Sequence, residues 1–260
     1  MFSLLKNWFS AEAPTTIPDA LWRDALNAMP FLSGFSDDEL NRLRELSAKF
    51  LHDKQFSAAA ELDLTGAMRL FIATQACLPI LNLGLESYKS WNEIIVYPRE
   101  FSPKHETIDE AGVVHISHHS LAGESWLGGP VVLSWEDAAQ SGAGDGYNVV
   151  IHEFAHKLDM LNGDANGFPP LHKNMSRNEW SQAFKHAFDK LQIDVNNQIY
   201  TEIDPYAAED PAEFFAVISE AFFETPDVVS RQFPDVYKQL ALFYRQDPLQ
   251  RLHYLQSQNH

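Results

Sequence analysis

One stretch restricts the possible folds of this chain more than any other, namely Tyr147–Met160 with the sequence YNVVIHEFAHKLDM. It places His152 and His156 four residues apart, with Glu153 directly after the first histidine. An α-helix turns about 100° per residue, so the two histidines lie about 40° apart on one helix face. Two imidazoles at this spacing can reach one metal ion, and a glutamate about 100° away can reach a water molecule beside that metal. The stretch therefore predicts a zinc-binding helix that carries its own general base.

The alternative interpretation is an ordinary amphipathic helix with two unrelated histidines on its solvated face. Apolar residues around the motif argue against this alternative, because they predict a helix that is buried on most sides: Val149, Val150, Ile151, Phe154 and Leu158. Buried imidazole and carboxylate groups require partners, and a metal ion would be one. The glycine-rich segment Ser141–Tyr147, which leads into the helix, suits a substrate cleft.

A catalytic zinc ion also needs a third protein ligand. Asp159 projects close to the histidine face, either as a ligand or as a carboxylate that orients a ligand histidine. Three further candidates share one face of a later, largely apolar helical segment: Glu213, Glu220 and Glu224. Glu213 is the first choice, but it also stands three residues after Asp210, where a helix-capping acid would stand. The pattern alone therefore leaves the third ligand open.

The rest of the chain predicts an α+β protein that is mostly helical and contains a small mixed β-sheet. Helical periodicity dominates residues 1–90, and it returns after the histidine motif. Between these parts lie three short runs rich in β-branched and aromatic residues, which predict strands: Asn92–Pro98, Gly112–His119 and Gly129–Trp135. We expect a single domain over residues 1–260, in which a helical region of about residues 1–90 packs on a catalytic core of about residues 91–260.

The run Gly129–Trp135 carries no charged residue and has Pro130 near its start. Proline is tolerated at the beginning of a strand or on an edge strand, but not in the middle of a central strand. We therefore predict an edge strand that lines the substrate cleft and pairs antiparallel with the main chain of a bound peptide. A central core strand is the alternative.

The composition restricts the partners and the location of the protein. Asp and Glu number 36 against 19 Lys and Arg, which gives a formal net charge of −17. Such a surface repels phosphate backbones and anionic lipids, so we expect neither direct nucleic-acid binding nor membrane binding. Cys77 is the only cysteine, and the apolar start of the chain is too short for a signal peptide or a membrane span. We expect a soluble cytoplasmic protein.

Two blocks of sequence together resemble a known family. HEFAHKLD, followed about 60 residues later by YAAEDPAEFFAVISEAF, is similar to the Mlc titration factor A family of zinc peptidases and to the catalytic domain of anthrax lethal factor. The resemblance implies a zincin-like fold and one Zn²⁺ ion per chain. It matches the metal ligands to His152, His156 and Glu213, the general base to Glu153, and the hydrogen-bond donor to the transition-state oxyanion to Tyr206.

The same resemblance implies a function. It implies a zinc-dependent metallopeptidase with aminopeptidase-type cleavage of small peptide substrates, which also regulates sugar-transport gene expression by binding the repressor Mlc. The alternative is a binding protein whose main task is to sequester the repressor and whose peptidase activity is slight or secondary. The helix after Glu213 departs from lethal factor at Val217, where that protein carries a second glutamate.

Overall fold

The computed structural model describes residues 16–99, 105–108, 114–117 and 128–258, and residues 1–15 of the expected N-terminal helical region lie outside these ranges. The first part of the described chain is mainly helical, as predicted. It contains three α-helices and two short 3-10 helices: α2 (Asp19–Asn27), η1 (Pro30–Gly34), α3 (Asp37–Asp53), α4 (Gly66–Cys77) and η2 (Leu85–Tyr88). Helix α3 begins with a capping box, in which Ser36 Oγ accepts a hydrogen bond from the N–H of Glu39 and the Glu39 carboxylate accepts one from the N–H of Ser36.

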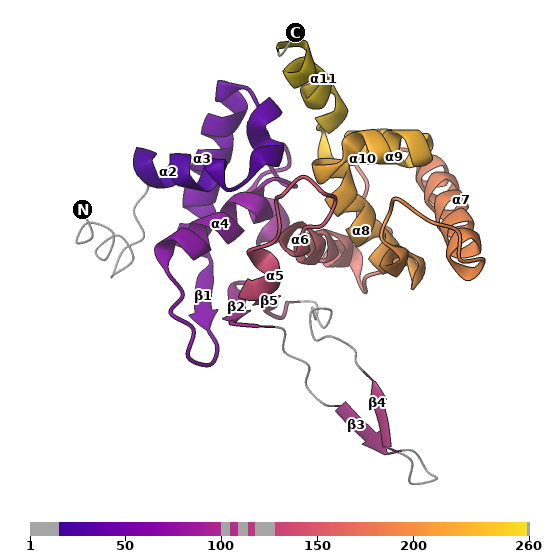
Figure 1. Cartoon of the computed structure of the whole chain (residues 1–260), viewed down its shortest axis with the longest axis horizontal. Helices are drawn as coiled ribbons and strands as arrows, with labels where there is room; N and C mark the ends of the chain where they lie inside the picture. Colours follow the sequence, from indigo (N-terminus) through magenta and orange to yellow (C-terminus); the bar gives the residue numbers. More distant parts are fainter. Residues whose placement is uncertain (1–15, 100–104, 109–113, 118–127, 259–260) are drawn as a thin grey trace.

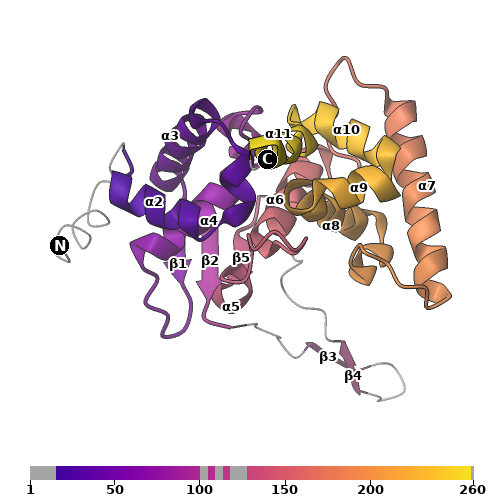
Figure 2. The same ribbon diagram turned by 45° about the horizontal axis from the view of Figure 1, so that its top comes forward.

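Three short strands lie side by side in the order β1–β2–β5 (Figures 1 and 2): β1 (Gln55–Ala58), β2 (Glu93–Tyr97) and β5 (Val131–Ser134). Both pairings are parallel, so the prediction of a mixed sheet is wrong for the described residues. Parallel neighbours need long crossover connections, and the connection from β1 to β2 contains helix α4. Strand β1 was missed because its four residues include only one large apolar side chain, Phe56.

Two further strands form a separate antiparallel pair, β3 (His105–Ile108) with β4 (Val114–Ser117). Strand β4 lies inside the predicted run Gly112–His119, and the remainder of that run is partly outside the described residues. The predicted strand therefore exists, but it does not belong to the three-stranded sheet.

Strand β5 is an edge strand of the three-stranded sheet within the described residues, as we predicted for Gly129–Trp135. One of its faces is nevertheless part of the core, because Val131 and Leu133 are buried. Its role in lining a substrate cleft remains a prediction.

The C-terminal half is helical again and includes helix α6 (Val149–Asp159), which carries the two histidines. The other elements of this half are α5 (Trp135–Ala138), η4 (Met160–Asn162), α7 (Arg177–Asn196), η5 (Pro205–Ala208), α8 (Pro211–Glu224), α9 (Pro226–Gln232), α10 (Pro234–Tyr244) and α11 (Pro248–Gln258). In both ribbon views α6 lies between the N-terminal helices and the helices α7 to α10. Helix α6 contacts α4, β5 and above all α8, so both halves of the chain meet at this helix.

Helix α8 is the most apolar of the long helices, and every residue from Phe214 to Glu224 is buried. The buried stretch includes Glu220 and Glu224, so two carboxylates lie inside the core beside α6. Buried carboxylates need hydrogen-bond partners, and their partners define the surroundings of the histidines. Among the described residues, no helix is long and apolar enough to cross a membrane.

Candidate active site

Side-chain caps fix the beginnings of the two helices that build the site. At the start of α6, Asn148 Oδ1 accepts a hydrogen bond of 2.9 Å from the N–H of Ile151. At the start of α8, Asp210 Oδ1 accepts hydrogen bonds of 2.7 and 3.0 Å from the N–H groups of Ala212 and Glu213. Asp210 is thus the cap of α8, and this leaves the Glu213 side chain available to point towards α6.

His152, His156 and Glu213 converge on one point between α6 and α8. Oε2 of Glu213 lies 3.0 Å from Nε2 of His152, and Oε1 of Glu213 lies 3.5 Å from Nε2 of His156. The two Nε2 atoms are only 3.2 Å apart. All three side chains are mostly buried, and their potential ligand atoms lie within 4.8 Å of one another. These three residues can hold a metal ion.

The donor set fits a metal ion better than it fits a hydrogen-bond network. Within the part of the chain that the structure describes, Oε2 of Glu213 has no hydrogen bond of good geometry although it is close to His152, and both buried carboxylate oxygens of Glu153 also lack a hydrogen-bond partner. Three carboxylates, those of Glu153, Glu213 and Glu220, surround two imidazoles. A divalent cation would balance this negative charge and occupy the lone pairs that face one another.

Electrostatic shifts in the cluster follow from this crowding of charge. Burial favours the neutral form of His152, but the adjacent carboxylates of Glu213 and Glu220 outweigh burial and hold the pKa of His152 well above its ordinary range. Burial would raise the pKa of Glu213, yet its contacts with both histidines lower it far below its usual value. Burial raises the pKa of Glu153 to about 7, against the opposing charge of the histidines. The cluster thus attracts positive charge to the point where the three side chains meet.

Tyr206 lies beside His152, on the 3-10 helix η5. Its ring centroid is 6.2 Å from that of His152, and 48% of the residue is exposed. Partial burial and the charge of Glu213 raise the pKa of Tyr206 above its ordinary range, so the phenol keeps its proton at neutral pH. Tyr206 therefore presents a hydrogen-bond donor beside the histidines and within reach of solvent.

Two of the other three acidic candidates, Glu220 and Asp159, take different places. Glu220 Oε1 lies 2.7 Å from Nδ1 of His152, on the opposite side of the ring from Glu213. Asp159 instead accepts hydrogen bonds of 2.7 and 2.6 Å from the N–H groups of Asn166 and Gly167. Among the described residues Asp159 has no hydrogen bond to a histidine, so it stabilises the loop after α6, while Glu220 contacts His152.

The loop held by Asp159 packs against the start of α8. A Cβ atom at Gly167 would lie 2.3 Å from the carbonyl oxygen of Pro211, the first residue of α8, and the φ angle of Gly167 is +74°. Only glycine fits both the space and the backbone conformation. Asp159 and Gly167 thus connect the end of the histidine helix to the position of Glu213.

A buried polar network behind the histidines was not predicted. It consists of Gln75 on α4, Asn148 before α6, and Glu220 and Glu224 on α8. The sequence predicted Glu220 and Glu224 as candidate ligands, because they are charged residues on an apolar helix, but it did not predict a role for Gln75 or Asn148. The one signal for Asn148 in the sequence is its position directly before an apolar helical run, where asparagine is a favoured N-cap.

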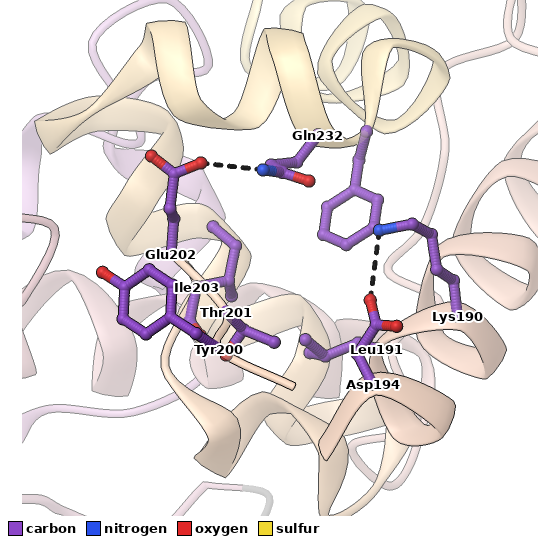
Figure 3. A pocket seen from close by; sticks show the side chains of 9 residues that line it. Lys190, Leu191, Asp194, Tyr200, Thr201, Glu202, Ile203 and Gln232 are labelled. Carbon is purple, nitrogen blue, oxygen red and sulfur yellow. Dashed lines mark hydrogen bonds and ion pairs between the residues drawn. The ribbon is translucent and has the colours of Figure 1, made fainter. Parts of the chain in front are cut away.

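A separate cavity of about 330 Å³ lies between α7, the segment 200–203 and the end of α9 (Figure 3). Its polar side chains are paired with one another: Gln232 donates a hydrogen bond of 2.7 Å to Glu202, and Lys190 donates one of 3.3 Å to Asp194. None of the residues that line this cavity belongs to the cluster around the histidines.

Comparison with known proteins places this geometry in a family. A family model described as glucose-regulated metallo-peptidase M90 matches residues 5–245. A protein of Serratia proteamaculans named Mlc titration factor A is 41% identical over 92% of both chains. A protein of the same name from Salmonella arizonae is 40% identical over 96% of this chain and all of its own length. The match spans both helices that bring the histidines and Glu213 together, and the chain belongs to the glucose-regulated metallo-peptidase M90 family.

Proposed function

We propose that the protein is a zinc-dependent peptidase of the aminopeptidase type, with one Zn²⁺ ion held by His152, His156 and Glu213. The observation that carries this proposal is the convergence of three potential ligand atoms within 4.8 Å of one another between α6 and α8. Two imidazoles and one carboxylate form a ligand set typical of catalytic zinc sites in peptidases. A zincin-like arrangement of the single domain agrees with this set, since the histidine helix follows the sheet and packs beside the edge strand β5.

Glu153 is the general base in this proposal. Its carboxylate is buried next to both histidines, and neither oxygen has a hydrogen-bond partner among the residues that the structure describes. Bound zinc supplies Lewis-acid activation of a water molecule and of the scissile carbonyl group. Glu153 accepts the proton of the attacking water and later donates it to the departing amine nitrogen. Its lone pairs suit this task, because no hydrogen bond from a described residue occupies them.

Tyr206 is the donor to the carbonyl oxygen that becomes negatively charged. Its ring lies beside His152, and its phenol is protonated at neutral pH. A donor that acts on developing charge is typically worth about 3–4 kcal/mol of transition-state stabilisation. Because the residue is half exposed, a substrate can approach the cluster from its side.

We also propose that the protein binds the repressor Mlc in the cytoplasm and thereby regulates sugar-transport gene expression. Several relatives about 40% identical to this chain carry the name Mlc titration factor A. The net charge of −17 supports a partner with a basic surface, such as a DNA-binding protein. Sequestration of this repressor as the main task, with slight peptidase activity, is the second candidate function.

Metal analysis tests the peptidase proposal. Purified protein from zinc-supplemented expression should contain about one equivalent of zinc, since three ligands define one site. His156→Ala and Glu213→Gln should lose the metal. Glu153→Ala should keep the metal and lose hydrolysis, because Glu153 acts on the water and not on the ion. Protein with well under one equivalent of any metal, or full zinc binding by His156→Ala, would contradict the assignment.

The Glu153→Ala variant also separates the two functions. It should still bind immobilised Mlc if repressor binding uses a surface away from the cluster. Peptidase assays on small amino-acid anilides and Mlc pull-down on the same preparations give both results. Full hydrolysis by the Glu153→Ala variant would exclude Glu153 as the general base. Absence of hydrolysis by the wild-type protein would favour the second candidate function.

A further inference from the structure

His152 is held on both sides of its ring. Nε2 faces Glu213 and His156, while Nδ1 lies 2.7 Å from Oε1 of Glu220. Oε2 of Glu220 already accepts a hydrogen bond from the N–H of Asn148, and we assign the contact at Oε1 as a second accepted hydrogen bond, donated by the Nδ1–H group of His152. When the ring binds a metal ion in its neutral form, its lone pair is then on Nε2, which points to the place where the three potential ligands meet.

Glu220 is itself held at both oxygens. Oε2 accepts a hydrogen bond of 2.5 Å from the main-chain N–H of Asn148, while Oε1 faces His152. Glu220 is buried on α8, two turns after Glu213, and cannot exchange these partners for water. These two contacts hold the Glu220 carboxylate in place, and its Oε1 atom in turn orients the His152 ring.

Asn148 extends this support towards the glycine-rich segment before α6. Its Nδ2 atom donates hydrogen bonds of 2.7 Å to Gln75 and of 2.7 Å to Glu224. Glu224 accepts a further hydrogen bond of 2.6 Å from the N–H of Gly144. Each of the two acidic side chains of α8 thus contacts two groups. Glu220 links Asn148 to His152, and Glu224 links Asn148 to Gly144.

We propose that Glu220 is a positioning residue of the metal site, which selects the Nδ1–H tautomer of His152 and fixes the orientation of its ring. The inference rests on the proposed metal site. It requires a group that accepts two hydrogen bonds at once, from His152 Nδ1–H and from Asn148 N–H. A glutamine in its place has one acceptor oxygen and one donor amide, so it must either break the contact with Asn148 or present N–H groups to His152. In the latter case Nε2 of His152 becomes protonated and is lost as a ligand.

The alternative explanation is that Glu220 only accepts a hydrogen bond from the buried N–H group of Asn148 at the start of α6. Glu224 offers a matched control for this explanation. It lies one turn further along the same helix, is similarly buried, and also accepts two hydrogen bonds, but neither donor is a histidine. Glu220→Gln and Glu224→Gln therefore cause similar losses of buried hydrogen bonds and differ in whether the metal site is affected.

The experiment measures the zinc affinity of the full-length chain by competition with a chromophoric chelator, for the wild type, Glu220→Gln, Glu224→Gln and Glu213→Gln. Replacement of a carboxylate that orients a ligand histidine typically weakens metal binding about 10–100-fold. We expect a loss of this size for Glu220→Gln, and a change of less than about threefold for Glu224→Gln. The visible absorption spectrum of the Co²⁺-substituted proteins provides a second readout, which should change for Glu220→Gln only.

Wild-type affinity and an unchanged cobalt spectrum in Glu220→Gln would overturn the inference, and so would equal losses in the two matched variants. Thermal unfolding confirms that both variants are folded before the comparison. The Glu213→Gln variant distinguishes a wrong role for Glu220 from a wrong assignment of the metal site. If Glu213→Gln binds zinc as tightly as the wild type, the metal site itself is misassigned.

Discussion

Replacement of Gly167 by alanine tests how the loop after α6 positions Glu213. The new Cβ atom would lie 2.3 Å from the carbonyl oxygen of Pro211 and 3.0 Å from its carbonyl carbon. Ordinary C···O contacts are about 3.3 Å or longer, so the loop or the first turn of α8 must move by about 1 Å. Asp159 resists a movement of the loop, because it accepts the N–H groups of Asn166 and Gly167.

The expected cost of this substitution has two parts. A non-glycine residue in a left-handed conformation costs about 1–2 kcal/mol, and forced displacement in a packed region costs about 1–3 kcal/mol more. Gly167→Ala should therefore lower the free energy of unfolding by about 2–5 kcal/mol. Because Pro211 precedes Glu213 by two residues, zinc affinity should also fall about tenfold or more, as for other losses of support around metal ligands.

Gly84→Ala is the control for backbone strain alone, since the φ angle of Gly84 is +85° and a Cβ atom there would meet no atom of the described residues within 4 Å. It should cost only the backbone part, about 1–3 kcal/mol, and leave zinc affinity unchanged. Urea unfolding and chelator competition measure both quantities. Equal destabilisation by Gly167→Ala and Gly84→Ala, with equal zinc affinity, would refute the idea that the contact with Pro211 positions Glu213.

Three further predictions concern the same region. Tyr206→Phe should lower kcat by about 10²–10³-fold with little change in KM, since in the proposed mechanism its hydroxyl acts on charge that develops only in the transition state. A raised KM with unchanged kcat would show a different role. Burial raises the pKa of Glu224 to about 7. The folding stability that comes from this shift is fully present below the ordinary pKa of about 4.5, where the side chain is neutral, and is lost as the pH rises through 7. The unfolding free energy of the wild type should therefore fall between pH 4.5 and 7.5 by up to about 3 kcal/mol relative to Glu224→Gln, whereas a pH-independent difference would contradict the shift. Removal of zinc by a chelator should lower the unfolding free energy by about 2.7 kcal/mol if free zinc had been a hundred times its Kd, and an unchanged unfolding curve would show that the metal does not bind the folded chain preferentially.

Local sequence determined the elements of this protein more reliably than their arrangement. The spacing of His152 and His156 places both on one face of α6 independently of the rest of the chain, because every α-helix has the same number of residues per turn. Hydrophobic periodicity likewise located most helices and the strands β2, β4 and β5. Strands β1 and β3 were not predicted. The sheet was taken for a mixed one, because strand direction depends on connections that no local pattern records.

The tasks of the acidic residues were decided by the tertiary structure. Glu213, Glu220 and Glu224 share one face of α8, and the sequence made them near equivalents. The packing of α8 against α6 places the first at the Nε2 atoms of the histidines, the second at Nδ1 of His152, and the third at Asn148 and Gly144. In the same way Asp159, three residues after His156, was expected to serve a histidine and instead holds the following loop. Sequence determines which residues a helix presents on a face, but the partner of each is set by contacts between segments about 60 to 80 residues apart, and only the folded chain brings those segments together.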